Sequence, residues 1–268
     1  MPTSPSSTVI KAFKVLELFR DHPLLGAGDC ARLLDIPRAS AYRMLISLKE
    51  AGVVESTPSG QYRLGLRLFE LGYLAPQRRR LFDHSYLPME KLVTTTRLPA
   101  HLGVRDDLEL LYLLKVHHSP DRAATRAGQR SPLYSSALGK VLLAHAPDET
   151  VDQVVRQGMA RLTPYTIRSA DQLLSELADI RRTGFGHDRE EGQLGLVCIA
   201  RAIRARTGDV VAALSLPAPA ERYPGGVDCF KPMLLRAADE IERSLGLRAA
   251  QAARAGAAGA TDCAPAGP

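Results

Sequence analysis

The chain has 268 residues, of which 45% are hydrophobic and 24% charged, a composition typical of soluble globular proteins. Its length exceeds that of one small module and favours two domains. No segment approaches the roughly 18 uninterrupted apolar residues that a membrane span requires, so we expect no membrane partner. The first residues show no basic region followed by an apolar core, so we expect no signal peptide.

The cysteines give a prediction about the compartment. They are Cys30, Cys198, Cys229 and Cys263, and they form neither a CxxC motif nor a short-spaced framework. This pattern favours free thiols over a disulfide scaffold. We therefore expect the protein in a reducing cytoplasm.

The net charge of +6 is unevenly distributed along the chain. Residues 1–80 contain 12 Lys and Arg against 7 Asp and Glu, which gives +5, whereas the remaining residues contain 23 against 22, which gives +1. An excess of positive charge in the first third fits a small nucleic-acid-binding module attached to a nearly neutral domain. Chance clustering of surface arginines is the alternative that composition alone leaves open.

Two short helices are predicted first. Residues at helical spacing form one apolar face of the first helix: Val9, Ala12, Phe13, Leu16 and Phe19. The segment AGDCARLLDIP predicts a second helix that Pro37 ends, with inward residues Cys30, Leu33 and Leu34.

The segment RASAYRMLISLKEAG predicts a third helix, which Gly52 ends. One face is apolar, with Ala41, Met44, Leu45 and Leu48, and the opposite face is polar, with Ser40, Tyr42, Arg43 and Ser47. VVES, a TPSG turn and QYRLG then predict two short strands. This order of elements is that of a winged helix-turn-helix, whose third helix fits the major groove of DNA.

The residues expected to contact DNA lie on this third helix and at the hairpin tip. They are Arg38, Ala39, Ser40, Tyr42, Arg43, Ser47, Ser59 and Gly60. Short polar side chains and arginines can reach base edges and phosphates. A three-helix packing module without a DNA role is the alternative.

The rest of the chain predicts a linker and an α+β domain. Residues 67–97 read as amphipathic linker helices whose apolar face can pair with a second subunit. Strands are expected in PAHLGVRDD, LELLYLLKV, GFGHD, LVCIARAI and VVAALSL, with helices at 138–146, 148–157, 170–183 and 227–246. The expected domains are residues 8–66 and 98–248, with disordered ends at 1–7 and at the Ala/Gly-rich 249–268.

The segment SPLYSSALGKVLLAHA places Gly139 and Lys140 at the start of a buried helix. Unpaired N–H groups and the helix dipole favour a negatively charged group there, and a glycine lets the backbone approach it. The alternative is that Ser135 or Ser136 caps the helix and Gly139 packs tightly. Lys140 is expected to form a structural ion pair with an acidic residue of DREEG.

Two other kinds of function use residue types that this chain contains. Cys198, His187 and Asp188 are the residue types of a thiol nucleophile with a base, but Cys198 lies in the apolar strand segment LVCIA, where burial raises the pKa of a thiol. A metal sensor would use histidines, but His117 and His118 are adjacent and face opposite sides of a strand. Convergence of His101 with one of them is possible. A cysteine-dependent enzyme and a metal- or thiol-responsive sensor therefore remain alternatives.

Three segments together resemble the IclR family of bacterial transcription regulators: AGDCARLLDIPRASAYRMLISLKEAGVVE, SSALGKVLLA and RRTGFGHDREEGQLGLVCIARAI. The resemblance covers about residues 8–248. It implies a winged helix-turn-helix, a linker helix and a GAF-like C-terminal domain that binds a small organic effector. We expect no cofactor, no metal and no enzymatic activity. It also implies a dimer or a dimer of dimers.

The resemblance assigns candidate site residues. Where the family commonly has Ser-Thr, this chain has Ala39-Ser40, whereas Tyr42-Arg43 is kept. Effector contacts are implied at Ala137, Leu138, Asp188, Cys198 and Ser215. Pro217 stands where a second serine can occur, so no particular effector is carried over.

The expected function is that of a sequence-specific regulator of transcription. We expect repression rather than activation, with double-stranded operator DNA as the partner. A small organic effector, a carboxylate or an aromatic metabolite, is expected to control the affinity for the operator.

Overall fold

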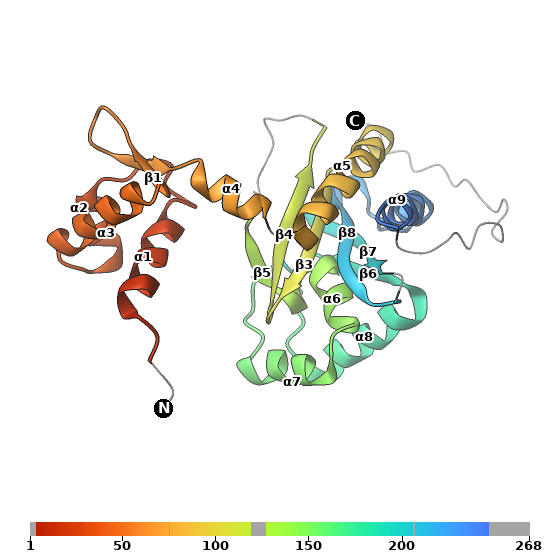
Figure 1. The fold of residues 1–268 in the computed structure, drawn as a ribbon. Coiled ribbons are helices and arrows are strands. Elements are labelled where there is room, and N and C mark those ends of the chain that lie inside the picture. The colour runs from red at the N-terminus through yellow and green to blue at the C-terminus, as the bar shows by residue number, and fades with distance from the viewer. Residues whose placement is uncertain (1–3, 75, 119–126, 206, 247–268) are drawn as a thin grey trace. The chain divides into compact units, whose positions relative to one another are not determined.

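The structure is a computed structural model that describes residues 4–74, 76–118, 127–205 and 207–246, with the side chains of 76–79 excepted (Figure 1). The chain divides into two compact units, Met1–Arg79 and Arg80–Pro268. The expected disordered end at 249–268 lies outside the described residues, as does part of that at 1–7.

The first unit is the predicted winged helix-turn-helix. It contains α1 (Ser7–Leu18), α2 (Ala27–Leu34), α3 (Arg38–Glu50), β1 (Val54–Ser56), β2 (Tyr62–Leu64) and α4 (Arg67–Tyr73). The two strands pair antiparallel, as expected for a hairpin. The core consists of Val15, Phe19, Leu25, Cys30, Ala41, Leu45, Val54 and Tyr62.

The apolar face of α1 is only partly buried. Val9 is 55% exposed and Phe13 is 62% exposed, whereas Val15 is fully buried. On α2, Cys30 is fully buried but Leu33 is 38% exposed. A unit of this size cannot enclose every apolar side chain, so periodicity alone does not tell which apolar face the core covers.

The second unit contains one six-stranded antiparallel sheet in the order β5-β4-β3-β8-β7-β6. Its strands are β3 (Ala100–Asp106), β4 (Glu109–Val116), β5 (Arg130–Pro132), β6 (Phe185–Arg189), β7 (Leu196–Arg204) and β8 (Val210–Pro219). β3 pairs with β4, and β7 pairs with β8, so consecutive strands form antiparallel hairpins. The sequence did not predict β5, because three residues that include a proline give no alternating pattern.

Helices cover both faces of this sheet (Figure 1). α5 (Pro76–Thr96) and α9 (Lys231–Ser244) pack with Leu102, Ile199 and Leu214 on one face. α6 (Ala137–Ala144), α7 (Asp148–Gln157) and α8 (Ala170–Thr183) pack with Cys198, Ala200 and Ala213 on the other. Alternate residues of each strand therefore face different helices.

The helices agree with the predicted ones to within a few residues, and α7 and α8 agree fully. Short 3₁₀ turns, η2 (Leu133–Ser135), η3 (Ala220–Arg222) and η4 (Asp228–Phe230), precede α6 and α9 and were not predicted. Cys30 and Cys198 are free thiols. Cys229 is disulfide-bonded, so the expectation of free thiols does not hold for it.

Candidate functional site

The outer face of α3 is polar and exposed. Arg38, Ala39, Tyr42, Arg43 and Ser47 are exposed, and Ser40 is half-buried. The opposite face supplies the buried residues of the core, as the sequence predicted. Asp35 adopts a left-handed conformation and Pro37 precedes the first turn, so the chain reverses sharply between α2 and α3. The unit therefore presents α3 as the second helix of a helix-turn-helix.

The hairpin tip is tightly hydrogen-bonded. The Gly60 N–H donates to the Thr57 carbonyl over 3.0 Å, and the Thr57 N–H donates to the Gln61 carbonyl over 2.8 Å. Gly60 has φ +76°, which only glycine adopts freely. Ser59 and Gly60 are exposed, so the tip can lie against a nucleic-acid backbone.

The start of α6 is capped from within the chain. Ser136 Oγ accepts a hydrogen bond of 3.1 Å from the Gly139 N–H. A Cβ placed on Gly139 would lie 2.8 Å from Cα of Leu133, so the glycine lets the helix pack on η2. The alternative reading of the sequence, in which a serine caps the helix and Gly139 packs tightly, therefore explains the presence of Ser136 and Gly139. The N–H groups of Ala137 and Leu138, in the first turn, precede the first N–H bonded within the helix.

Lys140 is the most enclosed charge near this helix start. Its side chain is fully buried, and Nζ lies 2.6 Å from Glu191 Oε2 and 3.1 Å from Glu176 Oε1. Glu191 belongs to the DREEG segment, so the predicted ion pair is confirmed. Lys140 is engaged by two carboxylates and is not the group that meets a ligand.

The strands bring Asp188, Cys198 and Ser215 to the side of the sheet that α6 covers. Asp188 and Cys198 are directly paired between β6 and β7, and Pro217 of β8 lies directly opposite Cys198. Ser215 is therefore the diagonal neighbour of Cys198, at about 7–8 Å between Cα atoms. Asp188, Cys198 and Ser215 are all at least 92% buried.

Asp188 also connects the strands to the chain that enters α6. Its Oδ1 accepts a 2.7 Å hydrogen bond from the Glu191 N–H. A Cβ placed on Gly192 would lie 2.7 Å from the Ser135 carbonyl oxygen and 3.7 Å from Asp188 Oδ2. The glycine thus allows the loop after β6 to approach the residue just before the helix cap. The result is one locality that contains the start of α6, Asp188 and Cys198.

Burial dominates the acid–base properties of this locality. It raises the pKa of Asp188 to about 7, against the lowering effect of the Glu191 N–H and Lys140. Burial also raises the pKa of the Cys198 thiol well above its usual range, and the Asp188 carboxylate raises it further. A thiol that stays protonated is a poor nucleophile, so the site does not favour thiol chemistry.

The residues of the enzyme alternative are not assembled. His187 pairs with Ile199, which packs in the core on the α5 and α9 side of the sheet, away from Cys198. His187 Nε2 instead lies 2.6 Å from Asp228 Oδ1. His187 therefore cannot act as the base for Cys198.

The metal alternative is also weakened. His101 and His117 do converge, with ring centroids 5.7 Å apart, whereas His118 hydrogen-bonds to Arg97. Among the residues that the structure describes, no group of three or more His, Cys, Asp or Glu side chains is placed to hold a metal ion.

Two residues that the sequence did not assign to the effector site lie beside Ser215. His101 of β3 pairs directly with Ser215, and Tyr112 of β4 lies against the ring of His101 at 5.7 Å between centroids. Alternation along PAHLGVRDD puts His101 on one sheet face with Gly103, but only the strand order tells that this face adjoins Ser215.

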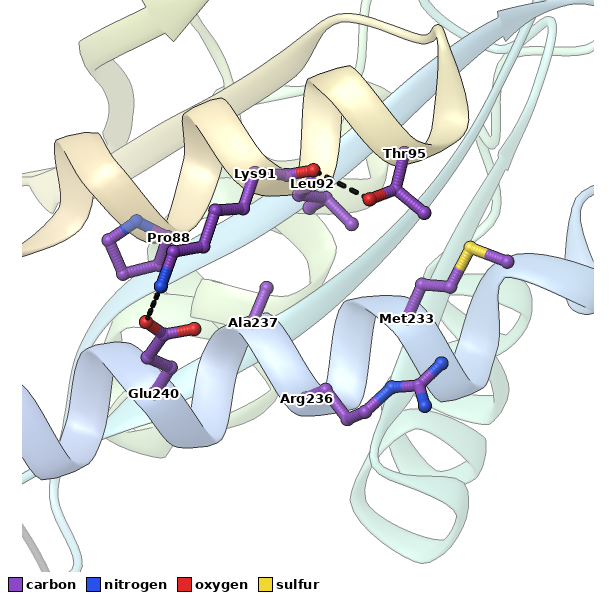
Figure 2. A pocket seen from close by; sticks show the side chains of 8 residues that line it. All are labelled: Pro88, Lys91, Leu92, Thr95, Met233, Arg236, Ala237 and Glu240. Atoms are coloured by element: carbon purple, nitrogen blue, oxygen red, sulfur yellow. Dashed lines mark hydrogen bonds and ion pairs between the residues drawn. The ribbon is translucent and has the colours of Figure 1, made fainter.

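A separate groove lies on the opposite side of the sheet, between α5 and α9 (Figure 2). It has a volume of about 200 Å³. Lys91 on one wall donates to Glu240 on the other over 2.6 Å. None of the predicted site residues lines it, and its exposed ion pair identifies it as a surface groove rather than the predicted site.

Among the described residues, no helix combines the length and the apolar character needed to cross a bilayer.

Comparisons with known proteins agree with both units. Residues 8–58 match the IclR helix-turn-helix domain, and residues 75–243 match the bacterial transcriptional regulator IclR C-terminal family. The chain is 36% identical over 220 residues to the HTH-type transcriptional regulator KdgR of Dickeya chrysanthemi, which covers 81% of this chain and 72% of that protein. It is 31% identical over 225 residues to the HTH-type transcriptional repressor AllR of Klebsiella pneumoniae, which covers 82% of this chain and 83% of the relative.

A solved structure is also similar over nearly the whole fold. It is that of an IclR homologue from Microbacterium hydrocarbonoxydans complexed with 4-hydroxybenzoate, at 30% identity and a TM-score of 0.82, covering 90% of this chain and 99% of that one. The winged helix, the antiparallel sheet domain and these matches lead to one conclusion: the chain belongs to the IclR family of DNA-binding transcriptional regulators.

Proposed function

We propose that this regulator is a repressor whose affinity for operator DNA is controlled by a small organic effector bound on the α6 side of the sheet. The observation that carries the proposal is the burial of Asp188, Cys198 and Ser215 next to the start of a helix, in a unit separate from the DNA-binding one. A few buried polar groups that converge on one face of a sheet are typical of a ligand site.

The DNA contacts are assigned to the exposed face of α3 and to the hairpin. Arg43 and Tyr42 reach base edges in the major groove, and Ser40, Ser47, Arg38 and Ala39 line the same face. Ser59 and Gly60 lie along the sugar-phosphate backbone. Because Ala39 offers no hydroxyl, the preferred operator differs from that of family members with serine at this position.

The effector contacts are assigned to Ala137, Leu138, Asp188, Cys198 and Ser215. The N–H groups at the start of α6 suit a carboxylate, since a helix N-terminus favours negative charge. Ser215 donates or accepts through its hydroxyl, and Asp188, which titrates near neutral pH, accepts from or donates to a hydroxyl of the effector. The aromatic acid bound by the structural relative from Microbacterium hydrocarbonoxydans supports an organic acid as the effector class.

The working protein is a dimer or a dimer of dimers in the cytoplasm. A pseudo-palindromic operator requires two α3 helices, and therefore at least two copies of the chain. Exposed apolar residues of the first unit supply a surface for self-association: Val9, Phe13, Leu66, Phe69 and Leu74. We assign residues 8–66 to DNA binding, 67–97 to the linker and 98–248 to the effector domain, with flexible ends at 1–7 and 249–268.

Repression is supported by the relative AllR, which is named a repressor. In this scheme the effector-free protein occupies the operator, and the effector favours a second arrangement of the DNA-binding units. The change in operator affinity equals the difference in effector affinity between the two arrangements.

The test is fluorescence anisotropy of the full chain on the DNA upstream of its own gene, against unrelated DNA, at about 150 mM salt. Non-specific binding is then typically weak, with Kd of about 10⁻⁴–10⁻⁶ M. A specific complex that small organic acids release supports the proposal. A specific complex that none of them changes contradicts the effector control, and tightening by an acid contradicts the repressor scheme.

A further inference from the structure

Three basic side chains, from β3, β4 and the residue that follows β4, gather next to the proposed effector site. His101 is the direct cross-strand partner of both Lys115 and Ser215. Its ring lies 5.7 Å from that of His117, and Lys115 Nζ lies 3.6 Å from the centre of the Tyr112 ring. Direct cross-strand partners project to the same side of a sheet, so the cluster adjoins Ser215.

Tyr112 joins the cluster to the rest of the site. It packs against the core on the α6 side of the sheet, which contains Cys198 and Ala213. Burial raises the pKa of Tyr112, and Cys198 and Asp188 raise it further. The basic cluster and the Asp188–Cys198 pair are two parts of one polar locality.

The polar atoms of this cluster are buried but unsatisfied. His101 Nε2, Lys115 Nζ and His117 Nε2 have no hydrogen-bond partner among the described residues. His101 as a whole is only 9% exposed. Folded proteins seldom bury several donors without partners, because each costs free energy of desolvation. Such a group in a ligand-binding domain indicates that a ligand supplies the partners.

The charge of the cluster defines what it binds. Burial lowers the pKa of Lys115 to about 8, so the ammonium is still mostly protonated at pH 7. Burial lowers the pKa of His101 to about 3, so its ring is neutral. One cation beside neutral imidazoles repels a metal ion and attracts an anion, which imidazole N–H groups can also hydrogen-bond.

We propose that Lys115, flanked by His101 and His117, is a second anion-binding position of the effector site, so that the effector carries two anionic groups. This inference rests on the proposed effector site. One carboxylate binds at the N–H groups that begin α6, and a second carboxylate or a phosphate pairs with Lys115. Pro217, which offers no hydroxyl opposite Cys198, is consistent with selectivity that comes from β3 and β4 instead.

The test is thermal unfolding of the full chain at pH 7 and constant ionic strength, with three kinds of probe at 10 mM. These are the straight-chain diacids from malonate to adipate, 3-phosphoglycerate as a phosphate-bearing carboxylate, and the monoamides of the same diacids. At least one two-anion probe is expected to raise Tm more than its monoamide or a monocarboxylate does. A larger Tm increase with a diacid identifies the second anionic group as a carboxylate, and a larger increase with 3-phosphoglycerate identifies it as a phosphate. Equal shifts by diacids and monoamides, or no shift by any probe, overturn the inference.

Variants locate the second position. Lys115→Met is expected to weaken binding of the active probe at least tenfold in calorimetry, and Lys115→Arg to restore most of it. The control Lys91→Met removes an exposed lysine in the separate groove and is expected to leave binding unchanged. Unchanged affinity in Lys115→Met overturns the inference.

The Tm of Lys115→Met without any probe tests whether Lys115 has a structural role instead of a ligand-binding role. Lys115→Met is expected to unfold at a higher temperature than the wild type in probe-free buffer, because it removes a buried ammonium that has no hydrogen-bond partner among the described residues. A lower Tm means that Lys115 stabilises the fold and overturns the inference. If the probe binds but does not release DNA, the proposed function fails while the inference stands. If monocarboxylates release DNA equally from wild type and Lys115→Met, the proposed function stands and the inference about Lys115 fails.

Discussion

Lys140 Nζ lies 2.6 Å from Glu191 Oε2, and both side chains are buried beneath the start of α6. Because Glu191 would keep a buried charge without its main partner, Lys140→Met is expected to lower the free energy of unfolding by about 3–5 kcal/mol. Chemical denaturation of the full chain, followed by the transition of the sheet domain, measures this loss.

The control for this pair is the exposed ion pair of Lys91 and Glu240. Lys91→Met is expected to cost about 0.2–1 kcal/mol, since solvent screens exposed pairs. Equal losses in the two variants would show that the buried pair contributes no more than a surface one.

Gly139 is expected to be intolerant of even a methyl group. A Cβ there would lie 2.8 Å from Cα of Leu133, which is backbone and cannot move aside. Gly139→Ala is expected to destabilise the sheet domain by roughly 1–3 kcal/mol, as overpacking does. Gly225→Ala is the matched control, because nothing lies within 4 Å of its Cβ position. Thermal unfolding of both variants distinguishes a packing role from a ligand-contact role, since the latter predicts unchanged stability.

The sequence predicted the elements better than the contacts between them. The α3 faces and most strands of the sheet follow from local spacing, which a single segment contains. The exposed side of α1 and the three-residue β5 do not, because burial depends on which other elements pack there. His101 illustrates the limit: its neighbour Ser215 is 114 positions away and becomes adjacent only through the strand order.

Asp188 is expected to make stability depend on pH. Burial raises its folded-state pKa from 3.8 to about 7, so the folded state binds the proton more tightly than the unfolded one. Its contribution is therefore fully favourable below about pH 3.8 and is lost as the pH rises through 7. Asp188→Asn retains an oxygen acceptor for the Glu191 N–H but does not ionise.

A comparison of wild type with Asp188→Asn isolates the titration of Asp188, because the other titrating groups are the same in both proteins and their contributions cancel. The free energy of unfolding of Asp188→Asn relative to wild type is expected to increase by a few kcal/mol between pH 4 and pH 8. Denaturant titrations at intervals of one pH unit measure it. A difference that stays constant with pH would mean that Asp188 is ionised throughout, as in an ordinary solvated carboxyl.

Ser215 is expected to affect the effector response and not DNA binding itself. Ser215→Ala removes one hydroxyl from the site, which costs about 0.5–1.5 kcal/mol for a neutral hydrogen bond. About two- to thirteenfold more organic acid should then be needed to release the operator, with effector-free DNA affinity unchanged. Thr95→Ala, which removes a hydroxyl that donates to the Lys91 carbonyl on the other face of the sheet domain, is the control. Loss of effector-free DNA binding in Ser215→Ala would indicate a structural role.

Arg43 tests the assignment of α3 as the recognition helix. It is exposed on the face opposite Ala41 and Leu45, so its replacement leaves the core intact. Arg43→Ala is expected to weaken operator binding by about 1–3 kcal/mol if the guanidinium reads a base edge, with the loss confined to the specific sequence. If it contacts only phosphate, binding to all DNA weakens uniformly and the salt slope falls by about one.

Anisotropy on operator and unrelated DNA at several salt concentrations separates these two results. Arg182→Ala is the control, since Arg182 is also exposed but pairs with Asp179 on α8, within the effector unit. Arg182→Ala removes the same charge as Arg43→Ala. It should leave the affinities for operator and for unrelated DNA nearly unchanged at about 150 mM salt, because charges more than a Debye length of about 8 Å from the DNA are largely screened. If Arg43→Ala and Arg182→Ala have equal effects, net charge rather than α3 determines binding, and the DNA surface must be sought elsewhere on the first unit.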